Sequence, residues 1–351
     1  MGKMNEFSGA EASLAIDDAA LGAYLAGRLE GLDGPLRSRQ FAGGQSNPTY
    51  LIEAGERRWV LRKKPPGQLL PKAHMVDREH RIFSALADTD VPVPRTYLLC
   101  EDPSIIGTEF FVMEYVQGRI FWDPTLPECS VDERRSLYDE MNRVLSALHQ
   151  VDYAARGLSG YGRPGNYFGR QIARWSRQYE AARTGDLPSM DALMKWLPEN
   201  IPDDDQSCIV HGDFRLDNMI FHPEEPRVLA VLDWELSTLG HPLADLAYNC
   251  MPYHLPSREA PALSTVAGTA AGEESGIPTE EQYVARYCER VGRSSIPAWR
   301  FYLVFSIFRY ASIVQGVYAR GLQGNASSAG DARGMRERAV QAADTAWSLV
   351  S

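Results

Sequence analysis

The sequence predicts a two-lobed α+β fold, with a small strand-rich N-terminal lobe followed by a larger, mainly helical C-terminal lobe. Up to about residue 117, apolar and polar residues alternate as they do in β-strands. Beyond it, apolar residues recur every three or four positions, as they do in helices. The 351 residues, 44% of them apolar, are enough to bury a core in each lobe. We therefore expect domains at 1–117 and 118–351.

The first lobe begins with a predicted amphipathic helix at 12–31, which Gly31 would end. The alternating region that follows turns at Gly43-Gly44 and at Gly55-Glu56, a pattern typical of antiparallel hairpins. The remaining predicted elements are a helix over 73–88, an extended segment over 91–102 and a buried strand over 109–121 that breaks at Gly118. Together these elements predict a small antiparallel sheet.

The second lobe begins with a helix whose capping box is formed by Ser130 and Glu133. Its apolar residues fall at helical spacing: Leu137, Met141, Val144, Leu145 and Leu148. Further elements are expected in this order: helices over 166–185 and 188–197, short strands in 208–213 and 227–234, a loop over 257–276, and helices to the end of the chain.

Composition narrows the class of protein. A formal charge of −10 argues weakly against nucleic acid as a partner, although solubility alone explains such a charge equally well. The five cysteines are dispersed, without a CxxC or a zinc-type Cys/His spacing, which indicates reduced thiols. The N-terminus has no signal-type apolar region, and the apolar run 301–308 is too short to span a membrane. We therefore expect a cytoplasmic protein.

Acidic and amide side chains gather between short apolar runs in the segment 209–249. Asp213 and Asn218 flank a tight loop after one predicted strand, and Asp233 follows another, so acids at the ends of adjacent strands can converge. Such oxygen ligands suit Mg²⁺ better than zinc. A two-metal hydrolase is the alternative, but it needs more histidine ligands. His222 and His241 each precede a proline and are better explained as loop or structural histidines than as metal ligands.

The N-terminal lobe contains the parts of a phosphate clamp. Gly43 and Gly44 let backbone N–H groups face phosphate oxygens. Arg62 ends a strand, with Lys64 on the same face by the strand period of two, and Glu79 lies on the helix that follows. A glycine-rich turn alone is more often only a turn, so the prediction depends on the three parts together.

Taken in order, these motifs resemble the aminoglycoside phosphotransferase (APH) and choline kinase-like family, which has a protein-kinase-like fold. The resemblance runs from about Phe41 to Asn249, and "HGDFRLDN" followed by "LDWE" is its most specific part. The segments "GGQSNPTY", "LRKKPPG", "AHMVDREHRI" and "DWELSTLGHPLADLAY" are similar to the kinase-like domain associated with acyl-CoA dehydrogenases. No flavin signature is visible, so an acyl-CoA dehydrogenase activity is not expected.

The resemblance implies ATP and Mg²⁺ as cofactors and assigns roles around the loop. Asp213 would be the catalytic base, with His211 holding the loop, while Asn218 and Asp233 would bind Mg²⁺. Glu235 would touch metal or substrate. The implied nucleotide-binding residues are Gly43, Gly44, Ser46, Asn47, Arg62, Lys64, Glu79, and Glu114, Tyr115 and Val116 of the hinge.

Three further assignments concern the choice between Arg62 and Lys64, two residues inside the loop, and Asp245. Protein kinases have lysine where this chain has Arg62 and pair it with the helix glutamate, so the resemblance implies that Glu79 is the partner of Arg62. Because the residue is arginine here, it stays open whether Arg62 or Lys64 contacts the phosphates. Asp217 and Arg215 would support the loop. Asp245 would anchor the loop from the start of a helix.

The phosphate acceptor would be a small molecule with a hydroxyl group. The stretches around Arg174 and Arg309 are basic and aromatic, which favours an anionic acceptor, although ordinary helix surface explains them about equally well. The acyl-CoA dehydrogenase-associated relatives imply a hydroxyacyl-CoA acceptor and a functional link to such a dehydrogenase. The alternatives are an aminoglycoside, amino-alcohol or sugar kinase, and a nucleotide-binding pseudokinase. The presence of Asp213, Asn218 and Asp233 counts against the pseudokinase.

Overall fold

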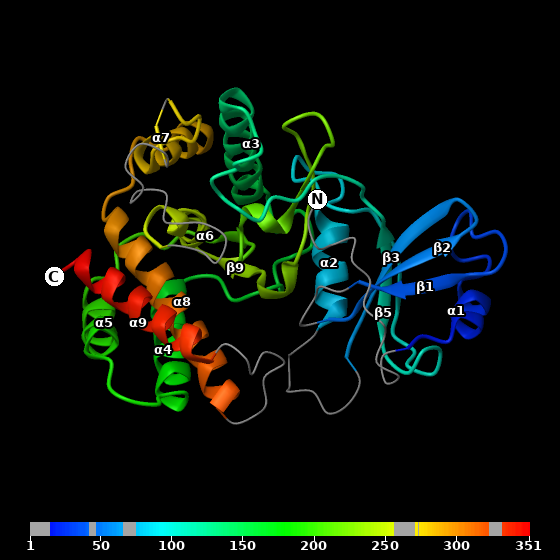
Figure 1. The fold of residues 1–351 in the computed structure, drawn as a ribbon, viewed down its shortest axis with the longest axis horizontal. Coiled ribbons are helices and arrows are strands. Elements are labelled where there is room, and N and C mark those ends of the chain that lie inside the picture. The colour runs from blue at the N-terminus through cyan, green and yellow to red at the C-terminus, as the bar shows by residue number, and fades with distance from the viewer. Residues whose placement is uncertain (1–14, 42–46, 66–74, 256–270, 273, 323–331) are drawn as a thin grey trace. The chain divides into compact units, whose positions relative to one another are not determined.

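The computed structural model describes residues 15–41, 47–65, 75–255, 271–272, 274–322 and 332–351 (Figure 1). The chain forms two compact units. Unit 1 comprises Met1–Trp122, Ala154–Leu158 and Leu216–Leu236; unit 2 comprises Asp123–Tyr153, Ser159–Arg215 and Ser237–Ser351. Unit 1 thus includes two segments from later in the chain. The division into domains at 1–117 and 118–351 stays a prediction.

Unit 1 is built on a five-stranded antiparallel sheet in the order β1-β2-β3-β5-β4. Its strands are β1 (Arg37–Gln40), β2 (Thr49–Ala54), β3 (Arg57–Lys63), β4 (Thr96–Cys100) and β5 (Phe110–Glu114). The predicted turn at Gly55-Glu56 joins β2 to β3, and Gly55 has the positive φ of 59° that a tight hairpin turn requires.

Strand β5 ends earlier than predicted. Glu114 is its last paired residue, opposite Trp59, whereas the sequence placed the break at Gly118. Beyond Glu114 the backbone leaves the sheet, and Arg119 exchanges two backbone hydrogen bonds with Phe221, each 2.8 Å long. The extended stretch therefore continues, but with a different pairing partner.

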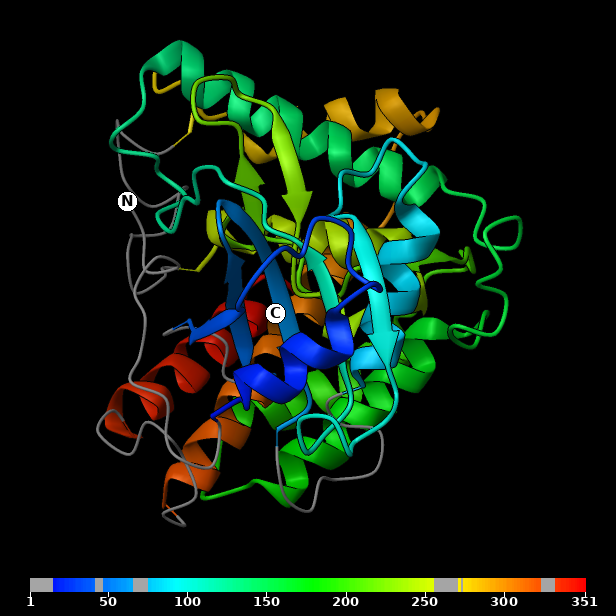
Figure 2. The ribbon, with the colours of Figure 1, turned by 90° about the vertical axis from the view of Figure 1, so that its right-hand side faces the viewer.

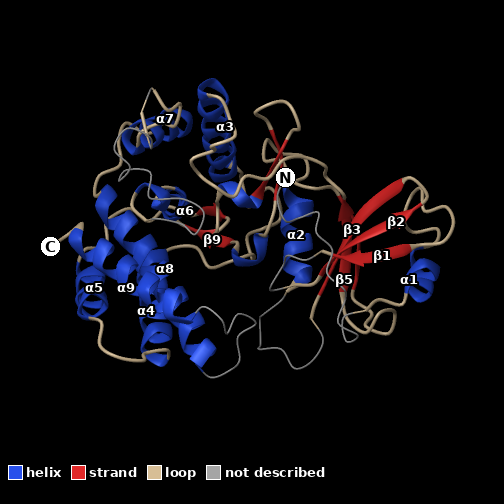
Figure 3. Ribbon diagram, viewed as in Figure 1, coloured by secondary structure: helices blue, strands red, loops and turns tan. Residues whose placement is uncertain are grey.

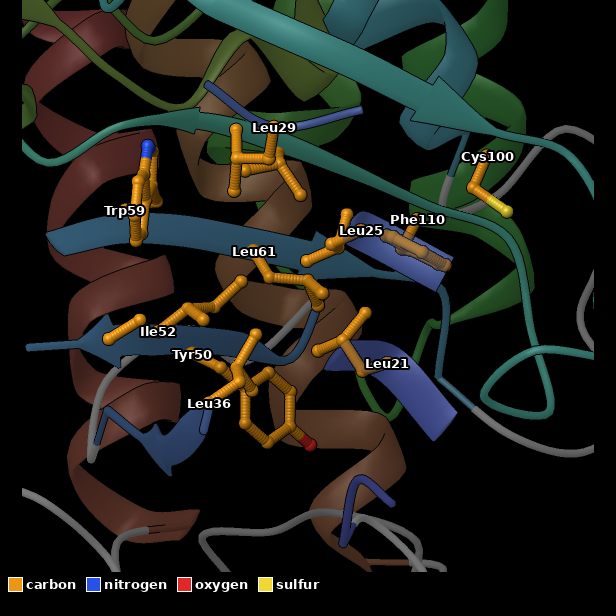
Figure 4. Close-up of a cluster of buried hydrophobic side chains, with 12 residues drawn as sticks. Leu21, Leu25, Leu29, Leu36, Tyr50, Ile52, Trp59, Leu61, Cys100 and Phe110 are labelled. Carbon is orange, nitrogen blue, oxygen red and sulfur yellow. The ribbon is translucent and has the colours of Figure 1, made fainter. Parts of the chain in front are cut away.

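One face of this sheet is covered by α1 (Asp18–Leu25), which lies in front of the strands in Figure 2. Figure 4 shows the buried cluster that results, in which Leu21 and Leu25 of the helix pack with Tyr50, Ile52 and Leu61 of the sheet. Alternate residues of a strand point to opposite faces, so these sheet residues share one side.

The leading helix is shorter than the predicted 12–31, whose first residues lie outside the described part. Asp17 caps its start by accepting the N–H groups of Ala19 and Ala20. The helix ends at Leu25, and Gly27 follows with a φ of 73°, in the left-handed region. The prediction that Gly31 ends the helix is therefore wrong.

The opposite face of the sheet contacts α2 (Val76–Leu86), where Phe83 lies 6.1 Å from Phe111 between ring centroids. Unit 1 also contains a hairpin of β7 (Met219–Phe221) and β8 (Val228–Val231), and Val231 donates its N–H to Pro92 O over 2.9 Å. After β8, Trp234 packs edge-on against Phe83, with the ring centroids 6.5 Å apart.

Unit 2 is mainly helical (Figure 3). Its elements are α3 (Val131–Gln150), α4 (Tyr167–Ala181), α5 (Pro188–Glu199), β6 (Cys208–Val210), β9 (Thr238–Gly240), α6 (Pro242–Asn249), α7 (Glu280–Val291), α8 (Trp299–Leu322) and α9 (Ala332–Ser348). Helix α8 packs against α4, α6 and α9. By length and composition α8 alone among the described helices could cross a membrane, but 72% of its most apolar window is buried, as in a core helix.

One expectation about strand pairing is wrong. The strands before Asp213 and Asp233 were predicted to be neighbours, but β6 pairs with β9, and β8 pairs with β7. The cause is the short strand β7, which starts directly after Asn218 and supplies the partner for β8. The chain between Asn218 and Asp233 therefore returns as a hairpin, which is made by β7 and β8.

Candidate active site

Arg62, at the end of β3 in unit 1, lies among three carboxylates. Its Nη1 is 2.9 Å from Glu79 Oε1 on α2, and its Nη2 is 3.2 Å from Asp233 Oδ1. Glu235 Oε2 lies 4.0 Å from the same Nη2. The predicted pairing of a strand cation with a helix glutamate is therefore confirmed, and the two acids of "LDWE" join it.

Among the residues that the structure describes, the ion pairs of this cluster set one guanidinium against three carboxylates. The Glu79 side chain is only 1% exposed. Burial raises the pKa of Glu79 to about 7, and although Arg62 lowers it, Asp233 and Glu235 raise it further. Burial by itself would lower the pKa of Arg62, but the three carboxylates raise it above its usual value. A further cation bound here would relieve the excess negative charge.

Asn218 and Asp233 stand at the same end of the β7–β8 hairpin. Leu232 donates its backbone N–H to Asn218 O over 2.8 Å, so the residue before Asp233 is tied directly to Asn218. Asp233 has a φ of 64°, the left-handed conformation that aspartate adopts more readily than most residues. Its side chain is 38% exposed, and that of Glu235 is 29% exposed. Two partly exposed carboxylates, those of Asp233 and Glu235, therefore follow the hairpin, and Asp233 lies at the same end of it as Asn218.

These residues fit a magnesium ion by their chemistry. Carboxylate and amide oxygens are hard ligands of the kind Mg²⁺ takes, and Mg²⁺ usually keeps ligands from substrate phosphates and water. In the described part of the chain, no group of three or more His, Cys, Asp and Glu residues could hold a metal ion by itself. An ion at Asp233 would therefore be completed by Asn218 and by phosphate or water oxygens.

The other predicted nucleotide residues of unit 1 are placed in part. Lys64 Nζ lies 2.5 Å from Glu109 Oε2, so Lys64 forms an ion pair with an acid that does not belong to the Arg62 cluster. Asn47 is buried. Gly43, Gly44 and Ser46 lie outside the described residues. Their roles stay predictions, as does that of Lys64 at the phosphates.

The predicted hinge follows β5 directly. Glu114 is the last residue of the strand, and both its backbone N–H and its side chain bond to Arg95. Tyr115 and Val116 continue beyond the sheet and are half-buried. The N–H of Glu114 is thus used within the protein. Adenine binding by other backbone groups of Glu114, Tyr115 and Val116 stays a prediction.

In unit 2, the loop after β6 is held by Asp245 in the first turn of α6. The backbone N–H groups of His211 and Gly212 both donate to its carboxylate, and His149 Nε2 lies 3.6 Å from Asp245 Oδ2. Burial raises the pKa of Asp245, but the nearby His149 and the hydrogen bond from the Gly212 N–H hold it below its usual value. The predicted loop anchor is confirmed by this contact.

The same loop is stabilised from within and from α8. His211 is fully buried, and its Nδ1 accepts the N–H of Asp213 over 3.1 Å. Arg309 donates from Nη2 to Gly212 O over 2.6 Å. Asp213 itself is half-buried. A buried histidine with a backbone contact agrees with a loop-holding role for His211.

Tyr248 is a neighbour of Asp213 for which the sequence analysis predicts no role. Burial raises the pKa of the Tyr248 phenol, and the nearby Asp213 carboxylate raises it further. Tyr248 follows Asp245 by three residues, about one helical turn, so both lie on the same side of α6. That spacing is the signal by which the sequence could have found it.

The two candidate acceptor residues differ in their surroundings. Arg174 is exposed on α4, with its guanidinium 5.2 Å from the Trp175 ring. Arg309 is only 6% exposed and bonds to the loop. An acceptor contact stays a prediction for both.

Comparison with known proteins identifies the family. The chain matches the phosphotransferase enzyme family, APH, over residues 37–282, and it belongs to that family. A solved structure from Ralstonia eutropha, provisionally described as an aminoglycoside phosphotransferase, is 48% identical, with a TM-score of 0.86 over 95% of this chain and 98% of that one. The predicted two-lobed, protein-kinase-like α+β fold is thereby confirmed.

More distant structures share the fold alone. Aminoglycoside phosphotransferase APH(4)-Ia, solved with AMP-PNP and hygromycin B, is 18% identical, with a TM-score of 0.57 over 92% of this chain and 98% of that one.

Among curated proteins, mouse acyl-CoA dehydrogenase family member 10 is 51% identical over 90% of this chain. Human acyl-CoA dehydrogenase family member 11 is 47% identical over 89% of it. The matches cover only 30% and 40% of those proteins, so the chain corresponds to one part of each. The predicted resemblance to the kinase-like domain associated with acyl-CoA dehydrogenases is confirmed.

Proposed function

We propose that this small-molecule phosphotransferase is an ATP- and Mg²⁺-dependent kinase that phosphorylates a hydroxyl group. The observation that carries the proposal is the cluster of Arg62 with Glu79, Asp233 and Glu235. It places a fixed cation beside partly exposed carboxylates, the combination that binding of a metal–nucleotide complex requires.

Each residue of the cluster has a role in this proposal. Glu79 orients Arg62, whose guanidinium would contact phosphate oxygens. Asn218 and Asp233 would hold Mg²⁺, with Glu235 beside them, and the ion would supply charge neutralisation on the phosphates. Because the donor set is oxygen only, ATP with Mg²⁺ is the expected cofactor pair.

Asp213 would receive the proton of the acceptor hydroxyl. The hydroxyl oxygen forms a bond to the γ-phosphorus, the bond from that phosphorus to the β–γ bridging oxygen breaks, and ADP leaves. The hydrogen bonds from His211 and Gly212 to Asp245 hold the loop before Asp213, so the carboxylate needs little reorganisation at the moment of reaction.

For the acceptor we propose the hydroxyl group of a hydroxyacyl-CoA. Two observations support it: relatives named as acyl-CoA dehydrogenase family members, and the exposed Arg174, which suits an anionic substrate. A functional link to an acyl-CoA dehydrogenase follows. Dehydrogenase activity is not proposed for this chain, because the matching family is a phosphotransferase family. We also propose a cytoplasmic location, on the ground that the five cysteines are dispersed in the sequence and form no CxxC pattern.

The alternatives are an aminoglycoside, amino-alcohol or sugar kinase, and a pseudokinase. ADP release with Mg²⁺ and ATP should be measured with 3- and 4-hydroxyacyl-CoAs, free hydroxy acids, choline, sugars and aminoglycosides, with GTP as the comparison nucleotide. Acceptor-dependent ADP release with a hydroxyacyl-CoA is the expected result. Release with an aminoglycoside alone would overturn the acceptor, and ATP binding without turnover on any acceptor would favour the pseudokinase.

A further inference from the structure

The peptide group that joins Gly212 to Asp213 is bonded at both of its polar atoms. Its N–H, which belongs to Asp213, donates to His211 Nδ1 over 3.1 Å, and its C=O accepts from Arg309 Nη2 over 2.6 Å. Gly212 has a φ of 84°, in the left-handed region that favours glycine. The orientation of this peptide plane affects the direction in which the Asp213 side chain leaves the backbone. Because Arg309 holds the carbonyl of this peptide, it contributes to that direction.

Arg309 is packed as a structural residue. It is 6% exposed, and its guanidinium carbon lies 5.2 Å from the centre of the Tyr248 ring and 5.6 Å from that of Trp175. A guanidinium between two rings has little freedom to turn. These surroundings suit a residue that holds one backbone carbonyl permanently. A residue that binds the acceptor must instead be accessible to a substrate that arrives and leaves.

Tyr248 gives Arg309 a second connection to Asp213. The Tyr248 side chain is buried and lies close enough to the Asp213 carboxylate for that group to raise the pKa of its phenol, and its ring lies against the Arg309 guanidinium. Arg309 therefore touches Asp213 indirectly at two points: through the Gly212 carbonyl on the backbone side and through the Tyr248 ring on the carboxylate side.

We propose that Arg309 is a positioning residue for Asp213, acting through the Gly212 carbonyl and Tyr248, and that it does not bind the acceptor. This inference rests on the proposed function, because it assigns a role relative to the proposed base. It replaces the acceptor-binding role that the sequence suggested for Arg309.

Steady-state kinetics separate the two roles. We expect Arg309→Gln to lower kcat about 10²-fold, as small misplacements of catalytic groups do, with the acceptor KM changed less than about twofold. Arg309→Lys keeps a cationic donor and should recover part of kcat. Arg300→Gln, an exposed arginine on the same helix, is the matched control and should behave as wild type. A raised acceptor KM with unchanged kcat would overturn the proposal, as would an Arg309→Gln variant with wild-type kinetics.

A second variant covers the case in which loss of Arg309 prevents folding. Tyr248→Phe removes only the hydroxyl, and we expect a kcat lowered about tenfold with acceptor KM unchanged. A wild-type kcat for Tyr248→Phe would remove the second connection and overturn that part of the proposal.

Hydrogen–deuterium exchange tests the loop without turnover, so a failure of the proposed function is distinguishable. Arg309→Gln should speed exchange in peptides covering residues 208–215, and Arg300→Gln should not. Unchanged exchange in Arg309→Gln would overturn the positioning role. If the wild-type protein turns over no acceptor while Arg309→Gln still speeds exchange in residues 208–215, the proposed kinase is refuted. The role of Arg309 in holding the loop then stands.

Discussion

Arg62 and Asp233 are 171 positions apart in the sequence, and their side chains meet at 3.2 Å in unit 1. The contact exists because the β7–β8 hairpin, late in the chain, belongs to the same unit as the N-terminal sheet. A cation from the sheet and an acid from the hairpin thus share one cluster, and predictions about the nucleotide follow from it.

Replacement of Glu79 by glutamine should weaken ATP binding. The buried Glu79 carboxylate is the partner that holds Arg62 Nη1 at 2.9 Å, and a neutral amide of the same shape holds a guanidinium less strongly. We expect the Kd for ATP with Mg²⁺ to rise about tenfold, measured by isothermal titration calorimetry. Glu53→Gln, which breaks the exposed pair with Arg39 in the same sheet, is the control. Equal affinities for the two variants would contradict the role of Glu79.

Replacement of Asp233 by asparagine should change the dependence on magnesium. The variant keeps the shape of the side chain but loses one of the carboxylates that would face the ion. We expect the Mg²⁺ concentration for half-maximal ATP binding to rise about tenfold or more, because the number of charged ligands strongly affects the affinity of a site for a divalent ion. A magnesium titration that superimposes on that of the wild type would exclude Asp233 as a ligand.

Asp245→Asn should destabilise the protein. Both carboxylate oxygens accept backbone N–H groups in a fully buried position, and an amide presents an NH₂ group to one of them. A buried donor facing a donor should cost about 2 to 4 kcal/mol in the free energy of unfolding. Urea denaturation measures this change. A loss below about 0.5 kcal/mol, the usual range for a surface change, would show that the anchor is dispensable.

The dependence of stability on pH should carry a contribution from His241. Burial lowers the pKa of this side chain to about 4, against a pull upward from Asp204, while in the unfolded chain it stays near 6.5. Between these values the unfolded state takes up a proton that the folded state does not. The stability due to neutral His241 is therefore complete above pH 6.5 and is lost as the pH falls towards 4, by about 3 kcal/mol.

A matched variant isolates that contribution. His241 caps α6, with Nδ1 accepting the N–H of Leu243 over 3.2 Å, and asparagine is also a good N-cap residue. The difference in unfolding free energy between wild type and His241→Asn should shrink as the pH is lowered from 7 to 4. A difference that stays constant over this range would contradict the lowered pKa.

The pairing of Arg62 with Glu79 could be predicted from the resemblance to protein kinases, in which the strand cation pairs with a helix glutamate. The Asp245 anchor was accessible from its position, as an acid at a helix start. The pairing of β6 with β9 was not, because strands of three or four residues have too little alternation to choose a partner. That choice is made by tertiary packing.

Arg309 shows a second limit. It contacts Gly212 from 97 positions away, and in sequence a buried arginine that serves a carbonyl looks the same as an arginine on a helix surface. The predicted helix over 12–31 is longer than α1 because the apolar spacing continues as far as Leu29. Leu29 does pack in the buried cluster of unit 1, but it does so from a turn beyond the end of the helix.

The most direct test of phosphotransfer is to follow ³²P from [γ-³²P]ATP into a hydroxyacyl-CoA with wild-type protein and with Asp213→Asn. The wild type should place label on the acceptor as a phosphate ester, and the variant should bind ATP normally but transfer label at least ~10²-fold more slowly, as expected for loss of a general base. Label transfer at the wild-type rate by Asp213→Asn, or label found only in inorganic phosphate with the wild type, would contradict the proposed reaction.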